Sequence, residues 1–309
     1  MHHRRLRLLL ALSRLGSMRA VADELDITTS TVSQQLAALA EEVGVPLVEP
    51  QGRRVRLTPA GRRLADHAVT ILAAMEAARL DLDPSAAPAG LLRVAAFATA
   101  VRRSLLPVTR VLAAEHPEVR LSIHEHEPAE ALGLLAADEV DLALTYDYNL
   151  APAAFDAALV AEPMWTTAWS LGVPTGSRRV RGDALAVLDP FRGSDWIVNS
   201  RNSADEVAVR TLASLAGFAP RIAHRADSLE LVQEMIRAGL GVGLLPAGEA
   251  TVRGVSLRRL TSPGVVLRSF AVVRAGRRDW PPLALVLRLL SAGPVRPGRT
   301  AEQPSARGG

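Results

Sequence analysis

Residues 17–39 read SMRAVADELDITTSTVSQQLAAL, and this stretch decides the fold of the first part of the chain. Ser17 can cap one short helix and Thr28 a second, because their hydroxyls accept hydrogen bonds from the free N–H groups at a helix start. The stretch predicts two short helices joined by a tight turn at Asp26, a candidate helix-turn-helix. On the second helix, apolar residues recur at helical spacing, at Val32, Leu36, Leu39 and Val43.

The second helix also carries short polar side chains away from its apolar stripe. Such side chains can reach base edges in the major groove of DNA. The same pattern fits a polar face that only meets water, because most helix pairs do not bind DNA. The candidate DNA-binding residues here are Thr28, Thr29, Ser30, Thr31, Ser33 and Gln34.

Residues 52–59 alternate between polar and apolar side chains and contain Arg53, Arg54 and Arg56. The alternation predicts the arm of a β-hairpin. Beside a helix-turn-helix, such a wing would hold its arginines against phosphates or in a minor groove. The alternative is that the three arginines only keep the exposed edge of a small sheet in solution.

Residues 59–82 predict one long helix with Pro59 in its first turn. Six apolar residues step along this helix in alternating fours and threes, a spacing typical of a coiled coil. We therefore expect this face to bind a second copy of the chain, and the alternative is that it packs onto its own chain. The six residues are Leu64, Ala68, Ile71, Met75, Ala78 and Leu82.

Prolines, a glycine and small residues at 81–90 indicate a linker, with a hinge at 84–90. Beyond it, strand-like and helix-like runs alternate in two series, which predicts an α/β body with a mostly parallel sheet. The fold class is thus α/β with an all-α, winged helix-turn-helix N-terminal domain. Residues 292–309, rich in Pro, Gly, Ser and Arg, predict a disordered tail.

The composition limits the possible functions. The chain has 309 residues, of which 49% are hydrophobic and 22% charged, as expected for an ordinary globular protein of two or three domains. Cysteine is absent, which excludes disulfides, thiolate nucleophiles and cysteine-ligated metal sites. We find no cleavable signal and no apolar run near the ~18 residues that span a bilayer, so we expect a cytoplasmic protein without membrane contact.

All 36 basic residues are arginine, and with 32 acidic residues they give a formal charge of +4. The absence of lysine fits the coding bias of a GC-rich genome better than selection for phosphate binding. Residues 1–58 contain eight arginines and six acids. The arginine count therefore does not indicate DNA binding, and basic character is local to the wing.

No cluster of reactive side chains stands out. His124 and His126 share one face of a predicted strand but lack a third ligand, so we do not expect a metal site. Residues 239–243 imitate a phosphate-binding glycine loop, but they lead from a helix into a strand and are better explained as a helix stop and turn. We therefore expect neither an enzyme nor a bound cofactor.

Several stretches together resemble the LysR-type transcriptional regulators. Residues 17–39, 44–48 (GVPLV) and 56–61 (RLTPAG) resemble the family's winged helix-turn-helix. Residues 139–144 (EVDLAL) and 237–246 (RAGLGVGLLP) resemble its effector domain, so the resemblance covers all but the C-terminal tail.

The resemblance implies a domain order. A DNA-binding head would span 1–58, a dimerising linker helix 59–83 and an effector-binding domain 91–291. The effector domain would consist of two Rossmann-like halves, as in periplasmic solute-binding proteins. The second half, at about 163–265, would be inserted in the first, at about 91–162 and 266–291.

The resemblance also implies the partners. These are double-stranded DNA with an interrupted palindromic operator, a small-molecule effector, a second copy of the chain in a dimer or dimer of dimers, and RNA polymerase. The chain departs from the family at Thr29 and Gln34, where members commonly have Gln and Arg, and at residues 48–50 before the wing, where Val-Glu-Pro replaces Phe-Glu-Arg. The operator sequence therefore cannot be carried over, and we expect recognition to depend more on neutral hydrogen bonds.

Effectors of open α/β sheets bind beyond the carboxyl ends of strands, and two such places stand out. Thr99 lies where family members often carry a ligand-contacting Ser or Thr, and residues 200–202 precede a helix that Ser203 and Glu206 could cap as a capping box. Arg201 favours an anionic effector. Each residue could instead be an ordinary cap or surface polar group. The candidate effector-binding residues are Thr99, Ala100, Tyr146, Ser200, Arg201, Asn202 and Asp227.

Three classes of function compete. A solute-binding receptor explains only the α/β body and needs an export signal, and an α/β enzyme explains only the fold. A ligand-responsive DNA-binding regulator explains the head, the long helix and the body together.

Overall fold

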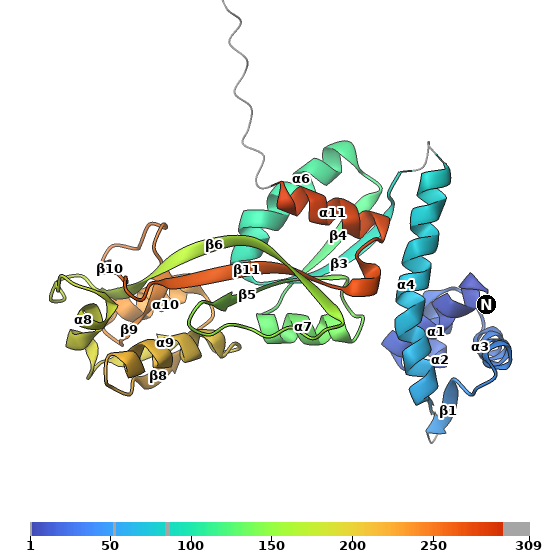
Figure 1. The fold of residues 1–309 in the computed structure, drawn as a ribbon, viewed down its shortest axis with the longest axis horizontal. Helices are drawn as coiled ribbons and strands as arrows, with labels where there is room; N and C mark the ends of the chain where they lie inside the picture. The colour runs from blue at the N-terminus through green and yellow to red at the C-terminus, as the bar shows by residue number, and fades with distance from the viewer. Residues whose placement is uncertain (1, 52–53, 84–86, 293–309) are drawn as a thin grey trace, which may run out of the picture.

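The computed structural model describes residues 2–51, 54–83 and 87–292. The molecule is elongated, with a small helical head at one end, an α/β body at the other and a long helix between them (Figure 1). Arg53 at the wing tip, residues 84–86 of the predicted hinge and the tail from 293 onward lie outside the described residues. Among the helices that the structure describes, none is long and apolar enough to cross a membrane.

The head contains α1 (His3–Leu15), α2 (Met18–Glu24) and α3 (Thr29–Val43), followed by a hairpin of β1 (Val48–Gln51) and β2 (Arg54–Leu57). The predicted caps are confirmed, because Ser17 Oγ accepts from the N–H of Ala20 and Thr28 Oγ1 from the N–H of Thr31. Asp26 has a positive φ in the turn between α2 and α3. The apolar stripe of α3 is buried against α1 and α2, with Val43 at the edge of this core.

Helix α4 (Pro59–Leu82) begins at the capping residue Thr58, with Pro59 in the first turn as predicted. Its apolar face is divided between two environments. Leu64, Ala68 and Ile71 pack against the core of the head, which is the alternative that we considered for the whole face. Met75 and Leu82 are 49% and 85% exposed, and Ala78 is exposed as well. Only the second half of the predicted seam is therefore free for a partner.

The body begins with a parallel β4-β3-β5 arrangement. Two of its helices, at residues 106–115 and 128–136, lie at the expected places. The elements are β3 (Gly90–Ala96), α5 (Ala98–Ala100), a π-helical turn (Val101–Leu105), α6 (Leu106–Glu115), β4 (Val119–Glu125), α7 (Pro128–Ala136) and β5 (Leu142–Tyr148).

A second parallel unit, in the order β9-β7-β8, forms the far end of the body. Gly239 has a positive φ of 77° between α10 and β9, so the glycine-rich segment is a helix stop and turn, as predicted. Helix α8 was not predicted. The elements are α8 (Ala184–Leu188), a 3-10 turn (Asp189–Phe191), β7 (Asp195–Val198), α9 (Ala204–Leu215), β8 (Arg221–Arg225), α10 (Leu229–Arg237) and β9 (Val242–Pro246).

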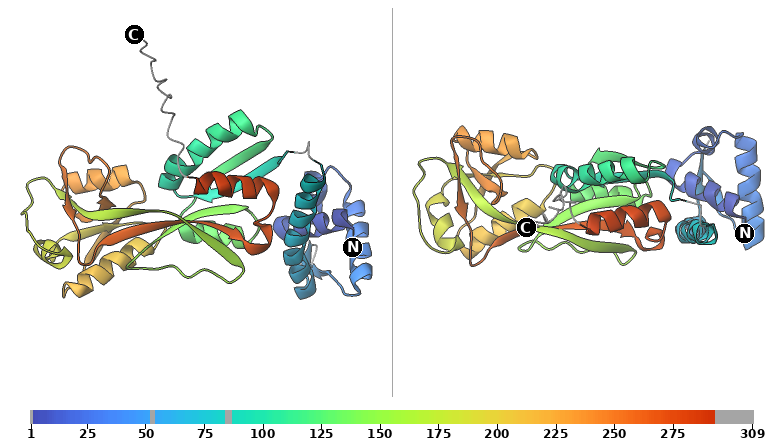
Figure 2. Two further views of the ribbon diagram at one scale, coloured as in Figure 1. Left: turned by 45° about the horizontal axis from the view of Figure 1, so that its top comes forward. Right: turned by 90° about the horizontal axis from the view of Figure 1, so that it is seen from above.

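Two long antiparallel strands, β6 (Leu159–Pro174) and β11 (Val265–Arg274), join the two units. The sheet order is β4-β3-β5-β11-β6-β9-β7-β8, and β10 (Val255–Arg259) pairs with β6. Figure 2 shows β6 and β11 running side by side along the body. The sheet is mixed rather than mostly parallel as predicted, because every pairing of β6 and β11 is antiparallel. The sequence predicted strands at both places but neither their continuity through the two halves nor β10.

The linker helix contacts the body where β11 ends. Arg274 donates to Asp66 of α4 at 2.6 Å, and the next residues form a 3-10 turn (Ala275–Arg277) before α11 (Pro281–Ser291). A Cβ on Gly276 would lie 1.8 Å from Thr70 Oγ1, so this turn packs directly on α4. The strand that crosses both halves thus ends against the helix that carries the head.

Candidate functional site

The polar row predicted on α3 is on the surface of the head. Four of its residues are exposed and can therefore reach a groove: Thr29, Ser30, Ser33 and Gln34. Thr28 instead uses its hydroxyl as the helix cap. The same hydroxyl lies 2.8 Å from the hydroxyls of Ser30 and Thr31. A direct base contact is thus better suited to the four exposed residues than to the cap.

The wing follows α3 in the same small domain. Arg56 pairs with Glu49 on the opposite strand, with Nε–Oε1 at 2.6 Å, and its side chain remains 57% exposed. The guanidinium therefore reaches solvent from an ion pair that orients it. Arg54 lies in β2 opposite Gln51.

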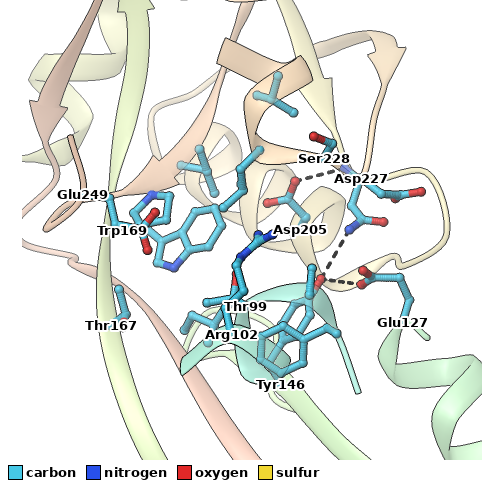
Figure 3. A pocket seen from close by; sticks show the side chains of 18 of the residues that line it. Thr99, Arg102, Glu127, Tyr146, Thr167, Trp169, Asp205, Asp227, Ser228 and Glu249 are labelled. Carbon is cyan, nitrogen blue, oxygen red and sulfur yellow. Dashed lines mark hydrogen bonds between the residues drawn. The ribbon is translucent and has the colours of Figure 1, made fainter. Parts of the chain in front are cut away.

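A cavity of about 530 Å³ lies between the two halves of the body. The first half contributes Thr99 and Tyr146, the second half Asp205 and Asp227, and β6 contributes Trp169 (Figure 3). Its lining combines aromatic and aliphatic side chains with converging polar and charged groups that could orient a ligand.

The structure brings only part of the predicted effector set to this cavity. Thr99, Tyr146 and Asp227 line it. Ala100 is fully buried in the core next to Thr99. The remaining three residues, Ser200, Arg201 and Asn202, are not among the residues that line the cavity.

Asp227 explains the position of the 200–201 segment. Its carboxylate accepts from the N–H of Ser200 at 2.8 Å, from the N–H of Arg201 at 3.2 Å and from the hydroxyl of Ser200. These bonds tie the segment before α9 to the end of β8. Ser200 is therefore a structural partner of Asp227 in this state of the protein.

The capping box predicted at Ser203 and Glu206 is wrong. Ser203 has helical backbone angles and makes no capping bond, whereas a capping residue needs an extended backbone. Asn202 Oδ1 accepts from the N–H of Ala204 instead, at 3.1 Å. Glu206 binds Arg210 and Arg225, so its carboxylate is not available to the start of the helix.

Arg201 cannot carry the argument for an anionic effector. Its guanidinium pairs with Asp227 at 3.0 Å, with Glu130 at 3.4 Å and with Glu125 at 3.7 Å. Asp227 belongs to the second half, whereas Glu125 and Glu130 belong to the first. Arg201 therefore links the two halves with its charge already compensated by the chain itself.

Glu127 and Tyr146 form a buried pair at the floor of the cavity. The hydroxyl of Tyr146 donates to Glu127 Oε2 at 2.8 Å and accepts from Asn199 Nδ2 at 3.4 Å (Figure 3). Burial raises the pKa of the Glu127 carboxyl, and it raises the pKa of the Tyr146 hydroxyl well above its ordinary value. Glu127 directly follows His126, one of the two histidines for which the sequence does not predict a metal site. Within the described chain, no three His, Asp or Glu side chains could hold a metal.

Asp205 is the second buried acid of the cavity, and sequence reasoning missed it. Its Oδ2 accepts from the N–H of Asn199 at 3.1 Å, and its Oδ1 has no hydrogen-bond partner among the described residues. Burial raises the pKa of this carboxyl from 3.8 to about 7, against the opposing effects of the Asn199 N–H and the neighbouring Tyr148 hydroxyl. An acid in the first turn of a helix is ordinarily a surface residue that favours the helix dipole, so nothing in the sequence distinguishes it.

The raised pKa of Asp205 predicts a stability effect. The folded protein retains this proton up to about pH 7, whereas the unfolded chain releases it near 3.8, so stability falls as the pH rises between these values. An asparagine at this position cannot ionise, so Asp205→Asn should raise the free energy of unfolding, by on the order of 2 kcal/mol at about pH 8 and by less at about pH 5. Thermal unfolding at both pH values measures this.

Glu206→Gln is the matched control on the same helical turn. The pKa of Glu206 is lowered, first by its hydrogen bond to Arg225 and then by that to Arg210, so its charge stabilises the folded protein above that pKa. Its neutral variant should be less stable than the parent at about pH 8. If the free energy of unfolding at about pH 8 changes in the same direction in both variants, burial of Asp205 does not control its ionisation.

Comparison with known proteins places the chain in a family. A family model described as "Bacterial regulatory helix-turn-helix protein, lysR family" matches residues 3–62, and one described as "LysR substrate binding domain" matches residues 85–293. The probable hydrogen peroxide-inducible genes activator of Mycobacterium avium is 32% identical over 88% of this chain and 85% of its own length. The nitrogen assimilation regulatory protein nac of Escherichia coli is 27% identical over 86% and 87%.

Solved structures share the fold over almost the whole chain. A full-length variant of OxyR from Pseudomonas aeruginosa matches with a TM-score of 0.70 at 19% identity, covering 98% of this chain and 99% of that one. CbnR in complex with its target DNA matches with a TM-score of 0.50 at 23% identity, covering 94% and 99%. The chain belongs to the LysR family of bacterial transcriptional regulators, with a DNA-binding helix-turn-helix head and an effector-binding α/β body.

Proposed function

We propose that the protein binds an interrupted, imperfectly symmetric DNA site as a dimer or a dimer of dimers, in the cytoplasm, and acts on transcription through RNA polymerase. The observation that carries this proposal is the exposed polar row of α3 in a head that also carries a hairpin wing. A two-fold symmetric protein places two such helices in successive major grooves, and its operator mirrors that symmetry.

Base reading and backbone binding fall to different residues. We assign base contacts to Thr29, Ser30, Ser33 and Gln34, with Gln34 able to pair with both hydrogen-bonding atoms of an adenine edge. Phosphate contacts fall to Arg53, Arg54 and Arg56 of the wing, because arginine neutralises phosphates without reading sequence.

These roles predict opposite patterns for two substitutions. Gln34→Ala should weaken the cognate site by about 1–3 kcal/mol and leave random DNA unaffected. Arg53→Ala should weaken binding to both DNAs alike. It should also reduce the slope of log affinity against log salt concentration by roughly one. Fluorescence anisotropy with the DNA upstream of the chain's own gene and with a scrambled duplex, at two salt concentrations, measures both effects. Equal losses on the two DNAs for both variants would contradict the assignment.

The arrangement of the body supports a response to a bound effector. The cavity lies between two halves joined by β6 and β11, and β11 ends in the Arg274–Asp66 contact with α4. An effector that binds one angle between the halves more tightly than another would shift that angle. We propose that the shift passes through β11 and α4 to the spacing of the DNA heads.

The effector binds without a thiol switch. The sequence contains no cysteine, so the thiol–disulfide chemistry that commonly underlies responses to oxidants is absent from this chain. A relative named for hydrogen peroxide therefore does not supply the signal for this protein. We propose a non-covalent small molecule that the protein leaves chemically unchanged.

A further inference from the structure

The cavity between the halves carries an excess of negative charge. Arg201 compensates Asp227 and Glu125 from outside it. Arg103 is held over the ring of Trp165 at 4.3 Å. The lining contains two arginines, Arg102 and Arg103, against six carboxylates: Glu125, Glu127, Asp205, Asp227, Glu230 and Glu249. Such a lining favours a cationic group on a ligand.

Two of these carboxylates are the most deeply placed and have no arginine to pair with. Neither Glu127 nor Asp205 forms an ion pair in the part of the chain that the structure describes. Asp205 Oδ1 is buried and accepts no hydrogen bond there. A buried carboxylate without a counter-charge is costly, and a ligand ammonium would supply both the charge and the missing donor.

One guanidinium in the same cavity also lacks a partner. Arg102 lies on the π-helical turn Val101–Leu105 and points into the cavity (Figure 3). It makes no hydrogen bond or ion pair with a described residue, although the charge of Glu230 acts on it at longer range. Arg102 is exposed and lines the cavity, so its guanidinium is available to a ligand carboxylate.

A buried indole in the cavity lining also lacks a hydrogen-bond partner. Trp169 is 9% exposed and lines the cavity, and its Nε1–H has no acceptor among the described residues. Indole nitrogen can only donate, so the missing partner is an acceptor such as a carboxylate oxygen. The cavity thus lacks an acceptor at Trp169 and Arg102 and a cationic donor at Asp205 and Glu127.

We infer that this cavity binds a small zwitterion, a molecule with one ammonium group and one carboxylate on a short apolar frame, as in the free amino acids. The ammonium lies against Asp205 and Glu127, and the carboxylate against Arg102 and Trp169 Nε1. The inference rests on the proposed function, because it names the chemical class of the effector.

Single-charge ligands satisfy only half of the cavity. An anion without an amine would face six carboxylates and leave Asp205 Oδ1 without a donor. An amine without a carboxylate would leave Arg102 and Trp169 unpaired. The apolar frame has a wall to pack on, since Phe97 and Trp165 lie 6.1 Å apart between ring centroids and both line the cavity.

The test uses the full-length protein and the twenty standard L-amino acids as probes, each by thermal shift and then by calorimetry. For every amino acid that binds, the deamino acid and the decarboxylated amine with the same side chain are measured. Each should bind at least about tenfold more weakly than the parent amino acid. If no amino acid binds at about 1 mM, or if a deamino acid binds as tightly as its parent, the inference is overturned.

Variants assign the two ends of the ligand. Asp205→Asn should weaken the amino acid and the amine about tenfold and leave the deamino acid unchanged. Arg102→Gln and Trp169→Phe should weaken the amino acid and the deamino acid but not the amine. Arg110→Gln, an exposed arginine on α6 outside the lining, is the control and should change none of them. A purely structural role would weaken all three probes alike.

The same preparations are tested for binding to the upstream DNA. If the protein binds this DNA and responds to a compound that is not a zwitterion, only the inference about the ligand is wrong. If it binds an amino acid but no DNA, the inference stands and the proposed function is wrong.

Discussion

Replacing Gly61 by alanine should disable DNA binding while leaving the effector body folded. A Cβ at this position would lie 2.1 Å from the carbonyl oxygen of Leu47, a backbone atom that cannot rotate away. That oxygen also accepts from the N–H of Thr58 at 3.0 Å, and Thr58 Oγ1 donates to the carbonyl of Pro46. The start of α4 is therefore fixed against the segment that leads into the wing. Forcing them apart should cost about 3 kcal/mol or more of the head's stability.

The chain offers separate signals for its two parts. All four tryptophans lie in the body, at positions 165, 169, 196 and 280, so their fluorescence reports its unfolding. Far-UV circular dichroism also includes the helices of the head. In Gly61→Ala, circular dichroism should lose signal at a lower temperature than fluorescence, and the affinity for cognate DNA should fall.

Gly133→Ala is the control for this substitution. Gly133 lies in α7, and a Cβ at this position would have open space around it, with nothing within 4 Å. Alanine should therefore stabilise that helix by up to about 1 kcal/mol. DNA binding should stay as in the parent. Should Gly61→Ala bind DNA and unfold like the parent too, α4 and the wing are not held together as described.

Features that depend on neighbours in the sequence could be predicted. The caps at Ser17 and Thr28 and the start of α4 at Pro59 follow from residues within one helical turn. The parallel units of the body follow from alternating strand and helix patterns. Of the seven candidate effector-binding residues, Thr99, Tyr146 and Asp227 line the cavity.

Features that depend on distant residues could not be predicted. Ser203 fails as a cap because Asn199 and Asp227 hold the segment before it in place. Asp227 follows β8 and is therefore distant from Ser203 in the sequence. Arg201 was assigned to a ligand because its partners Glu125 and Glu130 are more than seventy residues away. Asp205 looks like a surface acid until the fold of the body buries it.

Periodicity in α4 correctly indicates an apolar face, but it does not say what covers that face. The first half of the face packs on the head of the same chain. Ile71 belongs to that half, so a charge there would disturb the head directly as well as any dimer. Met75 lies one turn further on and is 49% exposed, so it separates the two effects.

Met75→Glu should dissociate the protein and abolish tight DNA binding. In the proposed dimer the second half of α4 is a seam between two copies, and a glutamate there would be a buried, unpaired charge costing about 3–5 kcal/mol. In the dimer, binding of one head raises the effective concentration of the second head at its half-site. Separated heads lose this advantage, so affinity for the full operator should fall by at least about 100-fold. Sedimentation velocity and anisotropy with full-site and half-site duplexes measure the two effects.

Ala74→Glu adds the same charge at an exposed position about 100° around the helix from Met75, outside the 4-3 stripe. It should leave both the oligomer and the affinity as in the parent. Half-site affinity should be nearly the same in all three proteins, because Met75 does not contribute to the buried core of the head. If Met75→Glu sediments like the parent, the seam is not the dimer contact, and the exposed apolar end of α4 must pack against another surface of the assembly.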